Sequence, residues 1–201
     1  MKRFAVDIVM LPPDNVMDIA IAYNRKLMLS GNQEIVLDKS RRMPHLSLLM
    51  GCLAAEQLQH ANRTLRSIAG KHSVLNLNVA NIRSVDSKSG ETTVSLDIAP
   101  TPELLALHES VVSHFVSLLT QDATASDMND PPPIKASSLE WVNKFIPDAC
   151  FGNFWPHITL GMGELSQNFE PFSFQATRIA VCHLGNHCTC TEILAEERLH
   201  G

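Results

Sequence analysis

A short sequence occurs twice in this chain, once in each half. Residues 44–51 read PHLSLLMG and residues 156–163 read PHITLGMG, so that proline, histidine, leucine, methionine and glycine coincide. Alternate side chains of a β-strand share one face. Each copy, read as a strand, therefore presents a histidine and a hydroxyl on one face and aliphatic side chains on the other. Brought together, two such strands would form a cradle of four polar groups.

The four polar residues of the repeat are His45, Ser47, His157 and Thr159. Two imidazoles, whose usual pKa is about 6.5, can divide acid–base work near neutral pH, the neutral one accepting a proton and the charged one donating it. Hydroxyl groups donate hydrogen bonds to phosphate oxygens. In-line displacement at a phosphodiester needs a base, an acid and such donors. We therefore expect His45 and His157 to be catalytic, in either order, and Ser47 and Thr159 to bind the substrate.

The two His-x-Ser/Thr motifs resemble those of the 2H phosphoesterase superfamily, which includes bacterial 2'-5' RNA ligases and 2',3'-cyclic nucleotide phosphodiesterases. Residues 141–147 (WVNKFIP) and 154–161 (FWPHITLG) are similar to the family's approach to its second motif. The resemblance implies an α+β fold that is bilobal and pseudo-twofold, with antiparallel sheets lining a central cleft and helices outside. It also implies cleavage of 2',3'-cyclic phosphates or related small cyclic phosphodiesters without metal or cofactor, with RNA 2'-5' ligation as an alternative outcome. At the family's motif positions stand His45, Ser47, His157 and Thr159.

Several segments show the alternation that predicts strands. Residues 1–13 contain an apolar run that we interpret as the first strand. Residues 75–79 and 94–98 alternate apolar with polar side chains, and the stretch 86–90 (DSKSG) between them is typical of a hairpin loop. Two further strands are predicted over residues 172–182 and 188–194.

Helical spacing of apolar residues predicts three helices, over residues 17–28, 58–68 and 104–118. Asp14 and Thr101 are expected to cap the first and third helices at their N-termini, with Pro102 in the first turn of the third. Helices interleaved with hairpins indicate an α+β architecture.

Residues 121–138 (QDATASDMNDPPPIKASS) lack periodicity and contain three successive prolines. This composition predicts a long surface loop, an insertion relative to the family, that either covers a site or is mobile. With 201 residues, the chain is expected to form a single bilobal domain spanning 1–201.

The charge balance restricts the partners. Lys and Arg number 16 against 21 Asp and Glu, a net charge of -5, which argues against long duplex nucleic acid because phosphate binding needs a basic face. A small nucleotide or an RNA end with a cyclic phosphodiester is compatible with this charge. No apolar run is long enough for a membrane span, and five cysteines, an odd number, favour a reducing compartment. We expect a cytoplasmic monomer that does not bind membranes.

Three further residues are candidates for substrate binding. Arg41 and Arg42 immediately precede the first motif. Because adjacent residues of an extended chain face opposite sides, at most one of these guanidinium groups would point towards a phosphate. A solvated basic turn is the alternative interpretation of both. His187, near the tip of the last predicted hairpin, is the third candidate, because it could reach the cleft from there.

Residues 182–190 (CHLGNHCTC) combine three cysteines with two histidines, the usual ligands of zinc. The segment contains no C-x-x-C pair, and Cys188 and Cys190 share a strand face, where buried thiols are common. We therefore predict buried thiols and no metal site. Two alternatives to a 2H-type phosphodiesterase are a non-catalytic module that binds nucleotides or RNA ends, and a zinc-dependent hydrolase that uses this segment.

Overall fold

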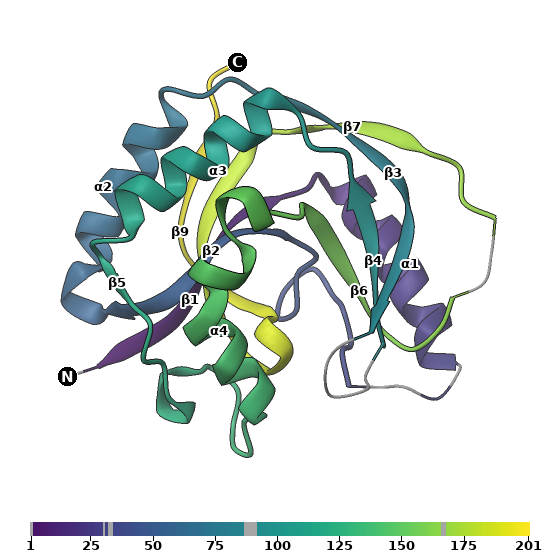
Figure 1. Cartoon of the computed structure of the whole chain (residues 1–201), viewed down its shortest axis with the longest axis horizontal. Coiled ribbons are helices and arrows are strands. Elements are labelled where there is room, and N and C mark those ends of the chain that lie inside the picture. Colours follow the sequence, from purple (N-terminus) through teal and green to yellow (C-terminus); the bar gives the residue numbers. More distant parts are fainter. Residues whose placement is uncertain (1, 30, 32–33, 87–91, 166–167) are drawn as a thin grey trace.

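The computed structural model describes residues 2–29, 31, 34–86, 92–165 and 168–201 (Figure 1). The strands are β1 (Arg3–Leu11), β2 (Leu46–Ala54), β3 (Leu75–Asp86), β4 (Thr92–Ile98), β5 (Leu119–Thr120), β6 (His157–Met162), β7 (Phe172–Ala176), β8 (Arg178–Leu184) and β9 (Cys190–Arg198). The α-helices are α1 (Asp14–Leu29), α2 (Leu58–Ala69), α3 (Pro102–Phe115) and α4 (Ala136–Ala149).

The strands form one nine-stranded sheet in the order β7-β3-β4-β6-β2-β1-β8-β9, with the short β5 paired to β2. The pairings between neighbouring strands are antiparallel. Two halves, β7-β3-β4-β6 and β2-β1-β8-β9, meet where Leu46 of β2 pairs with Ile158 of β6. The predicted α+β fold with two lobes is confirmed. The strands of the two lobes join at the centre to form one continuous sheet.

The two central strands share a local irregularity. Where β2 pairs with β1, the register passes from Leu49 to Ser47 and leaves Leu48 as an extra residue. Where β6 pairs with β4, the register passes from Gly161 to Thr159 and leaves Leu160 as an extra residue. Leu48 and Leu160 occupy the same position of the sequence repeat. Such bulges bend a strand and re-aim its side chains, so the two halves repeat the backbone geometry as well as the sequence of the motif.

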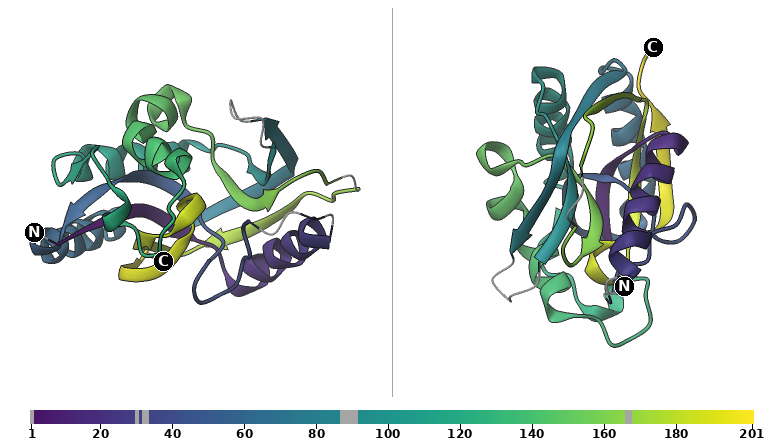
Figure 2. Two further views of the ribbon diagram at one scale, coloured as in Figure 1. Left: turned by 90° about the horizontal axis from the view of Figure 1, so that it is seen from below. Right: turned by 90° about the vertical axis from the view of Figure 1, so that its right-hand side faces the viewer.

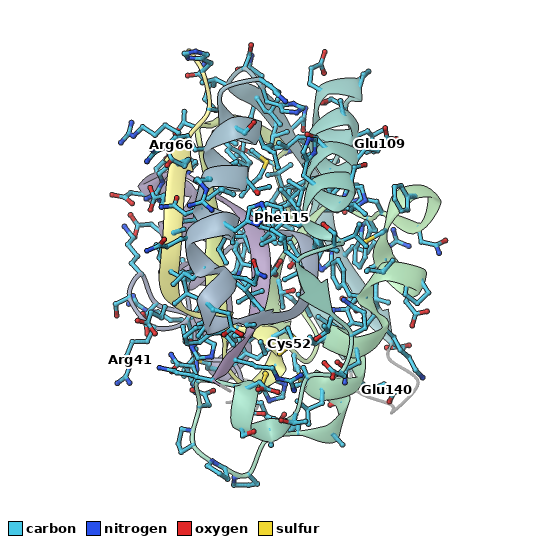
Figure 3. The ribbon with its side chains drawn as sticks, turned by 90° about the vertical axis from the view of Figure 1, so that its left-hand side faces the viewer. Arg41, Cys52, Arg66, Glu109, Phe115 and Glu140 are labelled. Carbon is cyan, nitrogen blue, oxygen red and sulfur yellow. The ribbon has the colours of Figure 1, made fainter. Side chains whose placement is uncertain are left out.

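The helices pack on different parts of the sheet. Helix α1 packs against β6, α2 packs against β8, β9 and α3, and both α3 and α4 pack against β2. Figure 2 shows a strongly curved sheet with α1 and α4 on opposite sides of it. Phe115, in the last turn of α3, is completely buried (Figure 3). Within the described residues, no helix combines the length and the apolarity that crossing a bilayer requires.

The three predicted helices correspond to α1, α2 and α3. Thr101 caps α3 as expected, because its hydroxyl accepts a hydrogen bond from the backbone N–H of Leu104 at 3.2 Å, with Pro102 as the first helical residue. Asp14 was expected to cap α1, and this is wrong. The carbonyl of Pro13 accepts the first helical hydrogen bonds, so Asp14 lies inside the first turn, where its charge still favours the helix dipole.

The predicted strand over residues 172–182 is two strands. The strand is interrupted at Thr177, between β7, which pairs with β3 at one edge, and β8, which pairs with β1 in the other half. Apolar alternation continues across Thr177 and does not reveal that the partner strand changes. Strand β9 begins at Cys190, because residues 186–188 form a short 3-10 turn. The predicted 86–90 hairpin loop lies almost entirely outside the described residues, although the antiparallel pairing of β3 with β4 is as expected.

The predicted loop 121–138 is irregular only as far as residue 135, because Ala136 begins helix α4. Helix α4 was not predicted, since Pro147 interrupts its sequence pattern near the C-terminal end. The irregular part is fixed to the sheet by polar contacts. Arg3 of β1 pairs with Asp127 at 2.8 Å, and the Asp130 carboxylate accepts the backbone N–H of Asn186 at 2.8 Å.

Candidate active site

The two histidines of the repeat make the same backbone contact. Nδ1 of His45 lies 2.8 Å from the carbonyl oxygen of Met43, and Nδ1 of His157 lies 2.8 Å from the carbonyl oxygen of Trp155. A carbonyl oxygen only accepts, so Nδ1 carries the hydrogen in both rings. Each Nε2 is then the nitrogen left to accept a proton, and the carbonyl two residues earlier holds each ring in place.

The burial pattern of β2 and β6 agrees with the predicted strand faces. Leu46 and Ile158 are buried, whereas the His, Ser and Thr residues on either side of them are partly exposed. Because Leu46 and Ile158 pair directly across the centre, the residues that flank them share one face of the sheet. In a regular antiparallel pair, diagonal neighbours of this kind are roughly 7–8 Å apart. The residues brought together are His45, Ser47, His157 and Thr159.

A buried carboxyl group lies beside the first motif. Asp7 of β1 is completely buried, and its Oδ2 accepts a hydrogen bond from the Ser47 hydroxyl at 2.6 Å and lies 3.6 Å from Nε2 of His45. Burial raises the pKa of Asp7 well above its usual value, and hydrogen bonds from the Ser47 hydroxyl and from the backbone N–H groups of Leu49 and Leu48 offset this only in part.

An aromatic and charged cluster lies beside the second motif. The Trp155 ring stacks on His157 with centroids 4.2 Å apart, and its indole N–H donates to Asp97 at 2.6 Å. Asp97 is also the residue of β4 that pairs with His157 of β6. The guanidinium of Arg83 lies 4.8 Å from the centroid of the Trp155 ring. This motif therefore has a carboxylate, an aromatic ring and a cation close to its imidazole.

Both imidazoles are less basic than usual. Burial lowers the pKa of His45 to about 4, with a smaller contribution from the nearby His157. Burial also lowers the pKa of His157, where Asp97 acts in the opposite direction and Arg83 in the same direction. Without an anionic ligand, burial favours the neutral form of both rings.

The two arginines before the first motif lie in different surroundings. The Arg42 guanidinium lies 3.5 Å from the Asp130 carboxylate, in the segment that precedes α4. The Arg41 side chain is exposed and points away from the body of the molecule (Figure 3). The backbone N–H of Arg41 donates to Asp38 at 2.7 Å, which fixes the turn. A role in substrate binding stays a prediction for both arginines.

His187 lies in the turn between β8 and β9. Its Nε2 is 3.2 Å from the Glu34 carboxylate, and its backbone N–H donates to the Ser138 hydroxyl at 2.9 Å. His187 also has a positive φ of 57°, a conformation that costs energy for a residue other than glycine. Its predicted contact with substrate stays a prediction.

The five cysteines are reduced and buried. Burial raises the pKa of Cys150 to about 12 and that of Cys190 well above its usual value. The described residues do not gather the cysteines and histidines of 182–190 into a metal-binding group. The one such group that they form contains Asp7, His45 and Cys190.

A family model of the 2'-5' RNA ligase superfamily matches residues 33–186 of the chain. The chain belongs to this superfamily. The match includes both His-x-Ser/Thr motifs and the strands from β2 to β8, but not β1 or β9. It agrees with the resemblance to 2H phosphoesterases drawn from the repeat. No curated protein sequence matches the chain.

Solved structures of the superfamily fold cover almost the whole chain. TT0787 of Thermus thermophilus aligns with a TM-score of 0.63 at 14% identity, covering 98% of each chain. E. coli LigT complexed with ATP aligns with a TM-score of 0.58 at 15% identity over 100% of each chain. E. coli LigT complexed with 3'-AMP aligns with a TM-score of 0.57 at 16% identity, covering 98% of this chain and 99% of that one. At these identities the likeness shows the fold.

Sequence reasoning missed three members of the site, Asp7, Asp97 and Arg83. Asp7 stands out in the sequence only as a charge within an apolar strand, which is a weak sign that a buried partner exists. Asp97 and Arg83 occupy polar positions of strands in which apolar and polar residues alternate. Nothing in the sequence around them indicates a functional role. Only the pairing of β4 with β6 brings Asp97 opposite His157.

Proposed function

We propose that this 2H phosphoesterase cleaves 2',3'-cyclic phosphate ends, or related small cyclic phosphodiesters, with His45 and His157 as its acid–base pair and without a metal cofactor. The observation that carries the proposal is the pair of Nδ1–carbonyl hydrogen bonds. They leave two imidazole Nε2 atoms for proton transfer, one on each side of the central Leu46–Ile158 pair.

The unequal surroundings of the two imidazoles suggest their roles. His45, whose pKa is about 4, is neutral at neutral pH and is assigned as the base that takes a proton from the attacking water. His157 lies opposite Asp97, whose charge favours the imidazolium form, and is assigned as the acid that protonates the leaving ribose oxygen. The anionic phosphate of a bound substrate would raise the pKa of His157 and so oppose the effect of burial.

The hydroxyl groups are proposed to hold the phosphate. The Thr159 side chain forms no hydrogen bond among the described residues, so its hydroxyl is available to a phosphate oxygen. The Ser47 hydroxyl donates to Asp7 at 2.6 Å and must turn away from it to donate to a substrate. Thr159 is therefore the better prepared of the two donors.

A small nucleotide or an RNA end is the proposed substrate. Structures that share this fold include E. coli LigT complexed with 3'-AMP, with ATP and with NADP+. The net charge of -5 agrees with a short anionic ligand held by local donors rather than with a long duplex. Arg41, Arg42 and His187 are the predicted further contacts of such a ligand.

RNA 2'-5' ligation is the second candidate function, favoured by the description of the matching family. Ligation opens the same 2',3'-cyclic phosphate, with the 5'-hydroxyl of a second RNA end in place of water as the attacking group and the ribose 3'-oxygen as the leaving group. The same base and acid serve both reactions. An RNA substrate that carries a 5'-hydroxyl end therefore tests for ligation in the same experiment.

The test is a turnover assay of the full chain with the four 2',3'-cyclic nucleotides, with and without a chelator. We expect hydrolysis to a single nucleotide monophosphate isomer at a rate that the chelator does not lower. Nucleotide binding without turnover would support the binding module instead. A rate abolished by chelation and restored by zinc would support the zinc-dependent hydrolase.

A further inference from the structure

Asp7, His45 and Cys190 form a cluster of three metal-ligand types inside the proposed site. A carboxylate oxygen, a ring nitrogen and Sγ from these residues lie within 4.8 Å of one another. We propose that this cluster binds Zn²⁺, and that the bound ion inhibits the enzyme because it occupies Nε2 of His45. The inhibition rests on the proposed function, whereas binding of the ion does not.

The three residues come from separate parts of the chain. Asp7 lies in β1, His45 immediately precedes β2, and Cys190 begins β9. The backbone N–H of Met43 donates to the Cys190 carbonyl at 3.0 Å, and this bridge holds the start of β9 against the segment that leads to His45. The cluster is therefore set by the sheet itself and does not depend on a surface loop.

The spacing of the ligand atoms suits a zinc ion. Zinc takes four ligands at roughly 2.0–2.3 Å from N, O and S atoms, which places neighbouring ligand atoms roughly 3–4 Å apart. Nε2 of His45 and Oδ2 of Asp7 are 3.6 Å apart. Small side-chain movements would complete a three-residue site, and the fourth position would be open to water.

The contacts around the cluster also match those of a metal site. A histidine that binds zinc through one nitrogen commonly donates its other N–H to a backbone carbonyl, as Nδ1 of His45 does to Met43 at 2.8 Å. The Asp7 carboxyl is oriented by the Ser47 hydroxyl at 2.6 Å.

The charge of the cluster balances when the ion binds. A buried carboxylate or thiolate without a partner is costly, so Asp7 and Cys190 are neutral acids when the site holds no cation. Zn²⁺ forms bonds to the carboxylate oxygen and the thiolate sulfur, and the two displaced protons go to solvent. The uncharged His45 ring donates its Nε2 lone pair. The loaded site is therefore neutral, like the empty one.

The first test measures binding without reference to activity. Zn²⁺ is titrated into the reduced full chain against a chromophoric chelator, and Co²⁺ is added separately to look for a thiolate-to-cobalt absorption band. We expect one ion per chain and a band that disappears in Cys190→Ser. Loss of an outer-shell partner typically lowers the affinity for the metal roughly 10–100-fold. Loss of the direct ligand Cys190 should lower the affinity for Zn²⁺ at least as much.

The matched control is Cys52→Ser, which alters another buried thiol, on β2 (Figure 3), and should keep the affinity and the band. Cys190→Ala is a second variant in case Cys190→Ser folds poorly, and circular dichroism checks the fold of each. Wild-type affinity no higher than that of folded Cys190→Ser or Cys190→Ala would overturn the site, whether or not the chain is an enzyme.

The second test measures inhibition with a 2',3'-cyclic nucleotide. Zn²⁺ should stop wild-type turnover reversibly, and Cys190→Ser should keep its basal rate and need at least tenfold more Zn²⁺ for the same inhibition. Zinc binding at the cluster with unimpaired turnover would overturn the inhibitory role. If the chain binds Zn²⁺ there but turns over no cyclic nucleotide in chelator, the proposed function fails and the metal site stands.

Discussion

The two halves of the sheet carry the same motif but surround it with different groups. In both halves the histidine bonds to the carbonyl two residues earlier, and a bulge falls at the same leucine of the repeat. Beside the first motif lies the buried Asp7, which bonds to Ser47. Beside the second lies Trp155, which links His157 to Asp97. The backbone is repeated, whereas the electrostatic environment is not.

The register of the strands explains how this difference arises. Asp97 of β4 stands opposite His157, and the corresponding position of β1 holds Leu11. Asp7 of β1 corresponds to Thr93 of β4. Each half thus contributes one carboxyl group, but at a different distance along its strand. Two imidazoles in a symmetric backbone can then have different proton affinities, which an acid and a base require.

The largest expected effect is the loss of either histidine. His45→Ala and His157→Ala should each lower kcat by about 10²–10⁴, the usual contribution of a general acid or base. The measurement is initial-rate kinetics with one 2',3'-cyclic nucleotide, and His60→Ala, which alters an exposed histidine, is the control. Near-normal turnover in one of the two variants would mean that the halves are not equal partners in catalysis.

Removing the hydroxyls should have a smaller effect, and an unequal one. Thr159→Ala loses a donor that is free to hold phosphate, so kcat/KM should fall roughly tenfold to a hundredfold. Ser47→Ala should lose less, because Ser47 must first give up its bond to Asp7. Thr159→Ser keeps the hydroxyl and serves as the control. A larger loss in Ser47→Ala than in Thr159→Ala would reverse the comparison.

The pH profile tests the assignment of acid and base. The base must be neutral, so kcat/KM should fall below about pH 4, the pKa of His45. The acid must be charged, so kcat/KM should also fall as pH rises through the pKa of His157, which lies below its usual value. Asp97→Asn should move this alkaline limb to lower pH, with a loss of up to about tenfold at pH 7 for each pKa unit.

Asp7→Asn is the matched variant of the other half. Burial keeps the Asp7 carboxyl protonated above its usual range, so the amide should leave both limbs of the profile where they are. Stopped-assay rates at half-unit pH intervals would compare the two variants. A shift of the acidic limb in Asp7→Asn would show that the Asp7 charge, and not burial alone, sets the pKa of His45.

The smallest effect concerns stability. The unfolded chain binds a proton at His45 near pH 6.5, whereas the folded chain does so only near pH 4. The contribution of His45 to the free energy of unfolding is fully present above pH 6.5 and is lost as pH falls towards 4. Between pH 7 and pH 5.5 the free energy of unfolding should therefore decrease by about 1 kcal/mol. Urea unfolding at these two pH values should show a weaker pH dependence in His45→Gln than in wild type. An unchanged dependence would exclude His45 as the source.

Local chemistry was enough to predict part of the fold. The alternation of His45, Leu46 and Ser47 follows from strand geometry alone, and the Thr101 cap with Pro102 follows from the needs of one helix end. For the same reason, the histidine and the hydroxyl residue of each motif could be assigned to one face of its strand. The family resemblance implied a central cleft between the two lobes. The pairing of Leu46 with Ile158 is seen only in the structure, because no local pattern states which strands pair.

The features that were missed depend on partners distant in sequence. The register of β4 with β6 places Asp97 opposite His157. The break at Thr177 results from a change of partner strand. Cys190 was expected among buried thiols, and the Met43 bridge also sets it beside His45. Helix α4 is an exception, because Leu139, Val142, Phe145 and Ile146 do have helical spacing, which Pro147 interrupts near the end of the helix. The other features depend on tertiary pairing rather than on propensity.

The change of partner strand at Thr177 has a consequence for how the protein is made. The strands of the first half come from both ends of the chain, since β1 and β2 lie before residue 55 while β8 and β9 follow residue 177. During synthesis, β1 therefore has an unpaired edge until β8 emerges from the ribosome. An open apolar edge favours aggregation, so the nascent chain is prone to aggregate for most of its translation. The strands of the other half, β3, β4, β6 and β7, all lie between residues 75 and 176, so they can pair while the first half still lacks β8 and β9.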